Sequence, residues 1–402
     1  FLQHLQWFSL KTIYFIISLY FYINLYNIMN IAIVGGGIVG LALGYKLSRV
    51  NGNKVHVFEK EKEVGFHQSG RNSGVLHCGL AYKPGSLKAK LAVSGIKQMI
   101  KYCKDYKINH DICGKIVVAS DEHEEKLLDN TAERGKLNGL KGLKYLNNEE
   151  LKKREPFVDS FKTLLVPEEG IIDYMGVMLS MKENIINAGG DIFLNTKIEN
   201  IEEKKNLIYI NKNSSISYNI IIYTTGLQSD INYKKFTKNK LNAKIVPFRG
   251  EYYTLEDHAK KLVNHLVYPV GNPKFPFLGV HFTRMINGDR EVGPNAVLAF
   301  KREGYKNSDI SINDMIDYLG YSGFLKFIGK NLTFCINEFS TSILKSSFLK
   351  KTQKLIPEIR DKDIKSGPAG VRAQGIDSSG NLMMDFEVKT HNNQIHVINA
   401  PS

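Results

Sequence analysis

Residues 30–59 read NIAIVGGGIVGLALGYKLSRVNGNKVHVFE, and this stretch decides the fold that we expect. The β-branched run at residues 31–34 predicts a buried strand, which leads directly into a glycine-rich turn at residues 35–40. A helix is predicted from Leu41 to about Arg49, and a second buried strand at residues 54–58. A strand, a glycine turn, a helix and a second strand in this order predict a dinucleotide-binding unit.

Three glycines of this turn have separate physical tasks. Gly35 permits the sharp turn, Gly37 lets the backbone approach a pyrophosphate, and Gly40 allows the helix to pack closely against the strand. The pyrophosphate would lie at the helix N-terminus, where the helix dipole and the N–H groups of residues such as Ile38 and Val39 favour anions.

An acidic residue ends the second strand of this unit. Glu59 follows Gly40 by about 20 residues, which is the spacing at which an acid binds the hydroxyls of a ribose. A carboxylate at this position repels a 2′-phosphate, so the pattern disfavours NADP. Lys60, the next residue, is predicted to belong to the same site.

Two later segments suggest a ligand and a return of the chain to this unit. Residues 67–79, HQSGRNSGVLHCG, are too rich in glycine and small polar residues to form a core element, so we expect a loop shaped around a ligand. A buried apolar strand at residues 219–223 ends in Thr224, Thr225 and Gly226, as expected for a strand of the same sheet.

The chain is long enough for two domains, and we expect an α/β protein that is α+β overall. Residues 29–95, 168–238 and 365–402 are assigned to a discontinuous Rossmann-like domain. Residues 96–167 and 239–364 are assigned to a substrate domain. The strand-like pattern of residues 246–300 predicts that this second domain is built on a mixed or antiparallel sheet.

The composition excludes some classes of partner. The net charge of +14 comes mainly from dispersed lysines, without an Arg-rich run or interleaved aromatic and basic residues, so no nucleic-acid partner is expected. A basic surface could still favour anionic substrates or lipids. The four cysteines lack zinc-site spacing, so a reduced compartment and no structural metal are expected.

Residues 1–28 form a hydrophobic extension that is about as long as a membrane-spanning helix. A membrane anchor, a targeting segment and translated upstream sequence are the three interpretations of this segment. Neither a small-residue cleavage site nor an Arg-rich amphipathic pattern supports targeting. Because Met29 directly precedes the first strand of the nucleotide unit, we favour it as the natural start of the protein.

Several segments in order resemble a known family. The glycine turn, the Thr-Thr-Gly strand and an arginine near the C-terminus are similar to the FAD-dependent oxidoreductase superfamily that contains D-amino-acid oxidase and glycine oxidase. Within it, the chain resembles the L-2-hydroxyglutarate dehydrogenases, also called oxidases, from residue 29 to residue 402. This closer resemblance is carried by residues 67–79, 247–252, 279–284, 292–305 and 367–374.

The resemblance implies a flavoenzyme that oxidises the C2 hydroxyl of L-2-hydroxyglutarate to give 2-oxoglutarate. Hydride would pass from C2 to flavin N5, and the electrons would then reach a membrane quinone, a similar acceptor or oxygen. A bacterial protein would lie in the cytoplasm or peripherally on the inner membrane, and a eukaryotic one in mitochondria. The implied FAD-binding residues are Gly35, Gly37, Ile38, Val39, Gly40, Glu59, Lys60, Ser69, Asn72, Ser73, Gly74, Ile198, Thr224, Thr225 and Gly226.

The substrate implied by the resemblance is a small dicarboxylate, which requires positive charge at both ends of its site. Arg372 occupies the place where related oxidases carry a carboxylate-binding arginine, and a planar guanidinium suits that task. Arg284 is our first candidate for the distal carboxylate, followed by Arg249 and Lys301.

A histidine suits the removal of the hydroxyl proton, because its ordinary pKa of about 6.5 lets it accept a proton near neutral pH. His77 and His281 are the candidates for this base. We favour His77, because it lies in the loop that is expected to touch the flavin.

One departure from the family concerns the end of the sequence. Family members continue past the motif at residues 399–402 into a turn and a helix that helps to hold FAD, so we expect either a fragment or weak FAD binding. Two alternatives remain at this point. One is a related flavin oxidase or dehydrogenase acting on an amino acid or glycerol 3-phosphate, and the other is a truncated, non-catalytic flavoprotein.

Overall fold

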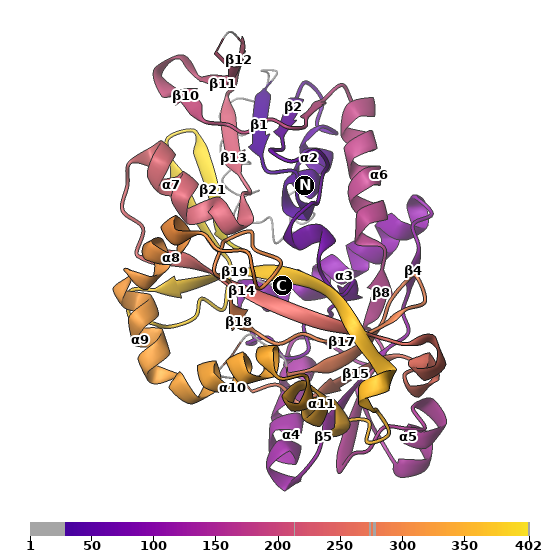
Figure 1. Cartoon of the computed structure of the whole chain (residues 1–402). Helices are drawn as coiled ribbons and strands as arrows, with labels where there is room; N and C mark the ends of the chain where they lie inside the picture. The colour runs from indigo at the N-terminus through magenta and orange to yellow at the C-terminus, as the bar shows by residue number, and fades with distance from the viewer. Residues whose placement is uncertain (1–28, 213, 273–274, 276–278, 401–402) are drawn as a thin grey trace.

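The computed structural model describes residues 29–400 except 213, 273–274 and 276–278. Figure 1 shows two large sheets, one in the upper half of the view and one in the lower half, with helices around them. The interpretations of residues 1–28 lie outside the described residues.

The first large sheet contains the predicted dinucleotide-binding unit. Its strands, in spatial order, are β20 (Glu387–His391), β21 (Gln394–Asn399), β13 (Ile220–Tyr223), β1 (Asn30–Val34), β2 (Lys54–Phe58) and β9 (Asp191–Phe193). All neighbours pair in parallel except β20 and β21. The predicted Rossmann-like sheet, including the return of the chain at β13, is therefore confirmed.

Both faces of this sheet are buried, as the apolar runs in its strands require. Ile31 and Ile33 of β1 point into the core that includes α2 (Ile38–Leu47) and α6 (Tyr174–Asn187). Ala32 and Val34 point to the opposite face. There they meet apolar residues of a small sheet made of β10 (Asn200–Glu202), β11 (Leu207–Asn211) and β12 (Ser214–Ser217).

The second large sheet is mixed, as predicted from its alternating pattern. Its main path is β18 (Val297–Leu298), β14 (Ala243–Leu255), β17 (Arg290–Gly293), β16 (His281–Arg284), β15 (Leu266–Pro269), β5 (Lys115–Ala119), β7 (Lys162–Val166) and β6 (Lys144–Leu146). Only β15 and β5 pair in parallel, and the other pairs are antiparallel.

The strand β19 (Ile364–Asp377) pairs with β14 along most of its length. Residues 365–402 are assigned to the cofactor domain by the sequence, whereas the hydrogen bonds of β19 place it in the second sheet. The division into domains stays a prediction, but this pairing sets Arg372 directly opposite Phe248 on the second sheet.

A small antiparallel sheet connects the two halves of the molecule. Its strands are β3 (Val75–Leu76), β8 (Gly170–Ile172) and β4 (His110–Asp111). Val75 pairs with Ile171 and Leu76 with Gly170. Continuing this register by one residue sets His77 opposite Glu169, although the two residues are far apart in the sequence.

Two of the remaining helices belong to the first half of the molecule: α3 (Leu87–Asp105) packs against α2 and α6, and α7 (Ser229–Thr237) packs on β21. The helices beside the second sheet are α4 (Glu122–Leu137), α5 (Asn148–Arg154), α8 (Ile312–Leu319), α9 (Ser322–Lys330), α10 (Leu332–Ile343) and α11 (Lys345–Gln353). Within the part of the chain that the structure describes, no helix has both the length and the apolar composition needed to cross a membrane.

Candidate active site

The glycine turn of the first sheet has the geometry of a cofactor cradle. Gly35 has a φ of +113°, and a Cβ at that position would lie 2.5 Å from the carbonyl oxygen of Thr224. A Cβ on Gly40 would lie 2.0 Å from the carbonyl oxygen of Gly35. Only glycine therefore allows the strand and the helix to approach this closely.

The N-terminus of α2 has backbone N–H groups that are available to bind an anion. Gly37 provides no side-chain cap, and the Ile38 N–H donates to the Ser69 hydroxyl over 2.9 Å. The N–H groups of Val39 and Gly40 have no hydrogen-bond partner among the described residues. Free N–H groups at the positive end of a helix dipole fit a pyrophosphate.

The residues predicted for the remainder of the nucleotide lie around this turn. Glu59 is buried, and its carboxylate accepts hydrogen bonds from the N–H groups of Gly36 (2.7 Å) and Glu61 (2.9 Å). The Thr224 hydroxyl donates to Gly35 O over 3.0 Å. The buried Thr225 hydroxyl has no partner in the described chain, as expected of a group that awaits a ligand.

Three further residues predicted to bind the cofactor lie farther from the glycine turn or already have partners in the protein. Ile198 is buried against the second face of the first sheet. Gly226 has a φ of +49° and lies beside the Gln68 amide, where a Cβ would come within 2.7 Å. Lys60 faces a polar network rather than open solvent, and its ammonium contacts Glu61 (2.8 Å) and Glu303 (2.6 Å).

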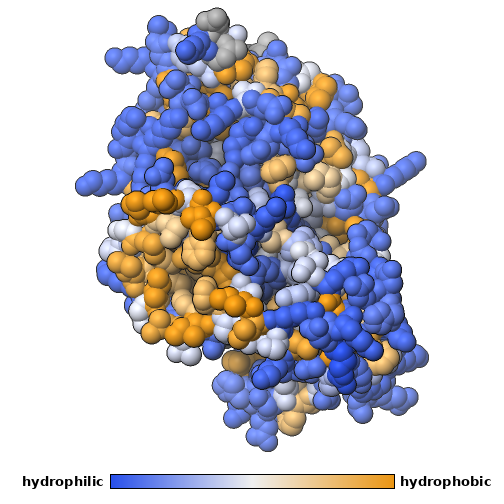
Figure 2. Space-filling view, in the orientation of Figure 1, coloured by the Kyte–Doolittle hydropathy of each residue, from blue (hydrophilic) through white to orange (hydrophobic). Residues whose placement is uncertain are grey.

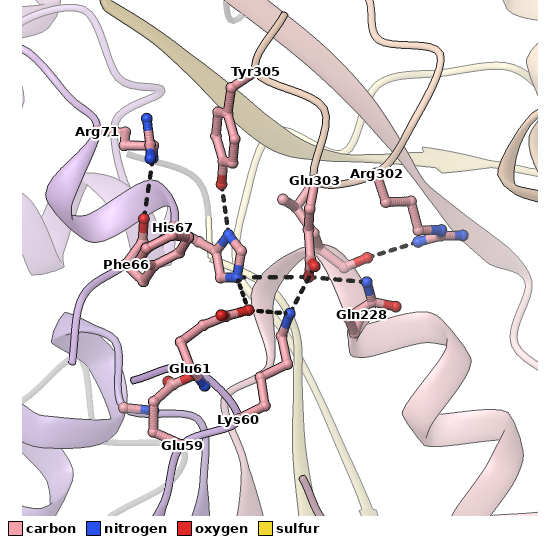
Figure 3. A network of polar contacts seen from close by, with 12 residues as sticks. Glu59, Lys60, Glu61, Phe66, His67, Arg71, Gln228, Arg302, Glu303 and Tyr305 are labelled. Atoms are coloured by element: carbon pink, nitrogen blue, oxygen red, sulfur yellow. Dashed lines mark hydrogen bonds and ion pairs between the residues drawn. The ribbon is translucent and has the colours of Figure 1, made fainter. Parts of the chain in front are cut away.

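Figure 3 shows this network, which joins the end of β2 to the loop that carries residues 302–305. His67 contacts the Tyr305 hydroxyl through Nδ1 (2.6 Å) and Glu61 through Nε2 (3.0 Å). Glu61, His67 and Glu303 are close enough together to hold a metal ion, but the Lys60 ammonium already bonds to both carboxylates. Burial opposes the charge of Lys60, yet hydrogen bonds to the two carboxylates raise its pKa.

The loop at residues 67–79 is held by its own polar side chains. The Asn72 amide donates to the carbonyls of Gln68 (3.1 Å) and Ser69 (2.7 Å), and the Asn72 side-chain oxygen accepts from the Gly74 N–H. Gly74 has a φ of +65°, which favours glycine. The Ser73 side chain lies near the hydroxyl groups of Tyr252 and Tyr268 on the second sheet. The loop thus links the cradle to the second sheet.

His77 follows this loop and belongs to a buried charge cluster. Its Nδ1 lies 3.3 Å from the Glu169 carboxylate, which also binds the Lys115 ammonium over 2.7 Å. Glu169 and Lys115 are 1% and 4% exposed. Burial opposes ionisation of Glu169, but Lys115 and His77 hold its pKa well below the ordinary range.

The sequence alone does not identify Glu169 and Lys115 as site residues. Lys115 begins an otherwise apolar buried strand, and Glu169 directly precedes the apolar strand β8. A charged residue at the border of a buried strand is a sequence pattern that can indicate a functional site. Only the register of β3 and β8 shows that Glu169 meets His77.

His281 lies close to this cluster on β16. Its Nδ1 contacts the Gly279 carbonyl (2.8 Å), and its ring stacks on Tyr268 with centroids 3.9 Å apart. Tyr268 also contacts the His77 ring, edge to face. Burial lowers the pKa of His281 to about 3, and the nearby His77, Arg372 and Lys115 contribute to this shift.

Arg372 points to the same part of the second sheet. One of its guanidinium nitrogens donates to the Asn295 carbonyl over 3.2 Å, and the Tyr252 side chain lies nearby. Burial lowers the pKa of Arg372. The fold therefore brings together His77, His281 and Arg372, which lie far apart in the sequence.

The other predicted substrate cations lie elsewhere. Arg284 forms an ion pair with Asp111, and Arg249 binds Glu251 (2.8 Å) and the Asn307 side chain. Lys301 is exposed. The structure does not bring these three side chains to the cluster around His77.

Comparisons with known proteins identify the family of the chain. A model of the family described as "FAD dependent oxidoreductase" matches residues 30–400. An L-2-hydroxyglutarate dehydrogenase of Indibacter alkaliphilus is 44% identical, over 93% of this chain and 94% of the relative. The mitochondrial L-2-hydroxyglutarate dehydrogenase of Bos taurus is 40% identical over 93% and 84%, and that of Escherichia coli K12 is 38% identical over 93% and 89%.

Solved structures support the fold. The FAD-bound L-alpha-glycerophosphate oxidase of Mycoplasma pneumoniae has a TM-score of 0.71 at 22% identity, over 92% of this chain and 88% of that chain. The glycine oxidase of Geobacillus kaustophilus has a TM-score of 0.64 at 16% identity, over 86% and 83%. The predicted fold class and FAD cofactor are thus confirmed. The chain belongs to the FAD-dependent oxidoreductase family and, within it, to the L-2-hydroxyglutarate dehydrogenases.

Proposed function

We propose that this protein oxidises L-2-hydroxyglutarate to 2-oxoglutarate. The observation that carries the proposal is the position of His77. The buried Glu169 carboxylate holds its ring, and the ring lines a cavity of about 1080 Å³ that Lys88, Lys115 and other cations also line. The substrate follows from the relatives described above, each of which is named for this activity. FAD, when bound, supplies the acceptor for the hydride that leaves C2.

In this proposal His77 accepts the proton of the C2 hydroxyl. The Glu169 carboxylate beside Nδ1 favours a proton on that nitrogen, which leaves Nε2 as the acceptor. The His77 side chain is 28% exposed and lines the cavity, so a substrate can reach it. His281 is the weaker base, since a pKa of about 3 makes proton transfer to its ring unfavourable near neutral pH.

Arg372 is the proposed partner of the C1 carboxylate. A guanidinium held on a rigid sheet can present two parallel N–H groups to a carboxylate, which a lysine ammonium cannot reproduce. Arg372→Lys should therefore raise KM for L-2-hydroxyglutarate by about 10-fold or more and leave the flavin bound. Steady-state kinetics together with the flavin spectrum check this prediction, and an unchanged KM would remove Arg372 from the site.

We also propose that the reduced enzyme passes electrons to a membrane quinone or a similar acceptor, through peripheral membrane contact. Figure 2 shows an apolar patch over α8, α9 and α10. Its most exposed side chains are Ile310, Ile312, Ile316, Leu325, Leu332, Ile336, Phe339 and Ile343. Such a patch is larger than scattered surface apolar residues explain, and the exposed Lys326 and Lys330 on α9 suit anionic lipid heads.

The location of the protein depends on its source. The animal relatives are named as mitochondrial, so mitochondria are the proposed location for a eukaryotic source. For a bacterial source, we propose the cytoplasm or the inner face of the membrane.

One spectroscopic experiment tests the proposed reaction. The flavin absorbance of the purified protein should bleach when L-2-hydroxyglutarate is added without oxygen, and should not bleach with D-2-hydroxyglutarate. Glycine and glycerol 3-phosphate serve as competing substrates, since structural neighbours are named for an amino acid and a glycerophosphate. Bleaching by either of these instead would assign the protein to a related flavin oxidase, and no bound flavin would indicate a non-catalytic chain.

A further inference from the structure

A cavity of about 1080 Å³ lies beside His77 and is strongly basic. Its basic lining residues are His77, Lys83, Lys88, Lys115 and Arg134. The carboxylates that line it are Glu169 and Asp385.

Both of these carboxylates already have partners. Glu169 binds Lys115 and His77. The two oxygens of Asp385 accept hydrogen bonds from the N–H groups of Leu87 (2.9 Å) and Lys88 (2.7 Å), and so hold the start of α3. The cavity therefore keeps an excess of positive charge.

Lys88 is the buried one among the cavity's cations that form no ion pair within the described chain, since Lys83 is exposed and Arg134 is half-buried. It is only 7% exposed, lies in the first turn of α3 and lines the cavity. Its ammonium lies 4.3 Å from the centroid of the Tyr82 ring, and it forms no ion pair with a carboxylate of the described chain. The helix N-terminus adds to the unfavourable energy, because its dipole repels a cation. A buried ammonium is normally paired, so this one is suited to receive an anionic ligand.

We infer that Lys88 binds the distal carboxylate of the substrate and thereby selects dicarboxylates over monocarboxylates. This inference rests on the proposed function. If the C1 carboxylate and the C2 hydroxyl lie at Arg372 and His77, the remainder of the substrate extends into the cavity that Lys88 lines. An anion in contact with Lys88 would add an ion pair to the more distant effect of the Asp385 carboxylate, whereas Arg284 already has Asp111 as its partner.

A pair of substrates of equal chain length tests the inference. L-2-hydroxyglutarate and L-2-hydroxypentanoate differ only in the distal carboxylate. Lys88→Met keeps the volume and removes the charge, so it should lower kcat/KM for L-2-hydroxyglutarate about 30-fold or more and leave that for L-2-hydroxypentanoate unchanged. Lys90→Met is the matched control, because Lys90 is an exposed lysine on the same helix.

A binding measurement on the unmodified holoenzyme keeps the inference testable if Lys88→Met does not fold. Burial lowers the pKa of Lys88 to about 8, while the nearby Asp385 carboxylate opposes this shift. Tyr82 lies against the ammonium, and Lys115, Glu169 and Arg134 line the same cavity. Affinity for glutarate, followed through the flavin spectrum, should therefore fall as the pH rises above about 8. Lys88→Arg should move this fall to higher pH.

The outcomes separate the two proposals. Failure of L-2-hydroxyglutarate to bleach the unmodified protein would contradict the proposed function itself. Normal bleaching, combined with a Lys88→Met variant that still prefers the dicarboxylate, would overturn only the role of Lys88. Glutarate affinity that stays constant from pH 7 to pH 9.5 would overturn it as well.

Discussion

Replacing His77 with alanine should lower kcat by about 100-fold or more while FAD stays bound. The alanine removes the group that we propose accepts the hydroxyl proton, but His77 lies outside the glycine turn that holds the nucleotide. Anaerobic stopped-flow reduction by L-2-hydroxyglutarate measures the rate, and the flavin spectrum of the purified variant measures cofactor retention.

His123→Ala is the matched control for this variant. His123 is an exposed histidine on α4, so its loss should change neither turnover nor flavin content. If His77→Ala turned over at nearly the normal rate, the role of the base would move to His281 or to another group. Loss of flavin from His77→Ala would instead show that the histidine contributes to the cofactor site.

Replacing Gly40 with alanine should abolish FAD binding and destabilise the protein by about 1–3 kcal/mol or more. The new Cβ would lie 2.0 Å from Gly35 O and 2.7 Å from the Thr224 hydroxyl. The first of these atoms is backbone at the end of β1, so the strand and the helix would have to separate. Urea unfolding measures the loss of stability, and the ratio of flavin to protein absorbance measures FAD.

Gly95→Ala is the control for the same chemical change. Gly95 lies inside α3, and beyond the backbone of that helix a Cβ at this position would meet no described atom within 4 Å. Because alanine favours a helix interior over glycine, this variant should be up to about 1 kcal/mol more stable and keep its FAD. If Gly40→Ala bound FAD normally, the close approach of strand and helix would not be required for the cofactor.

The first sheet could be predicted well because its signals are local. The strand, glycine turn, helix and second strand at residues 30–59 each follow from backbone rules that act over a few residues. The structure contains β1, α2 and β2 in this order and pairs the two strands in parallel. The return of the chain at β13 was also predicted, from a buried apolar run that ends in two threonines and a glycine.

The substrate cations could not be predicted in the same way. Arg284, Arg249 and Lys301 were selected by residue type and by their place in motifs, and their roles stay predictions. Whether a cation is available to a ligand depends on the carboxylates that the fold places beside it. In the structure Asp111 forms an ion pair with Arg284, and Glu251 forms one with Arg249. Within the described part of the chain Lys88 forms no such ion pair, and the sequence does not distinguish it from the other lysines.

The sequence by itself determined the dinucleotide unit, the family resemblance and a short list of histidines and arginines. These follow from local backbone preferences and from motifs that lie within continuous segments. Only the tertiary structure decided that Glu169 and Lys115 meet His77, and that Lys88 is buried at the same cavity. The reason is physical, because strand register and burial set which charges become neighbours, and both depend on residues far apart in the chain.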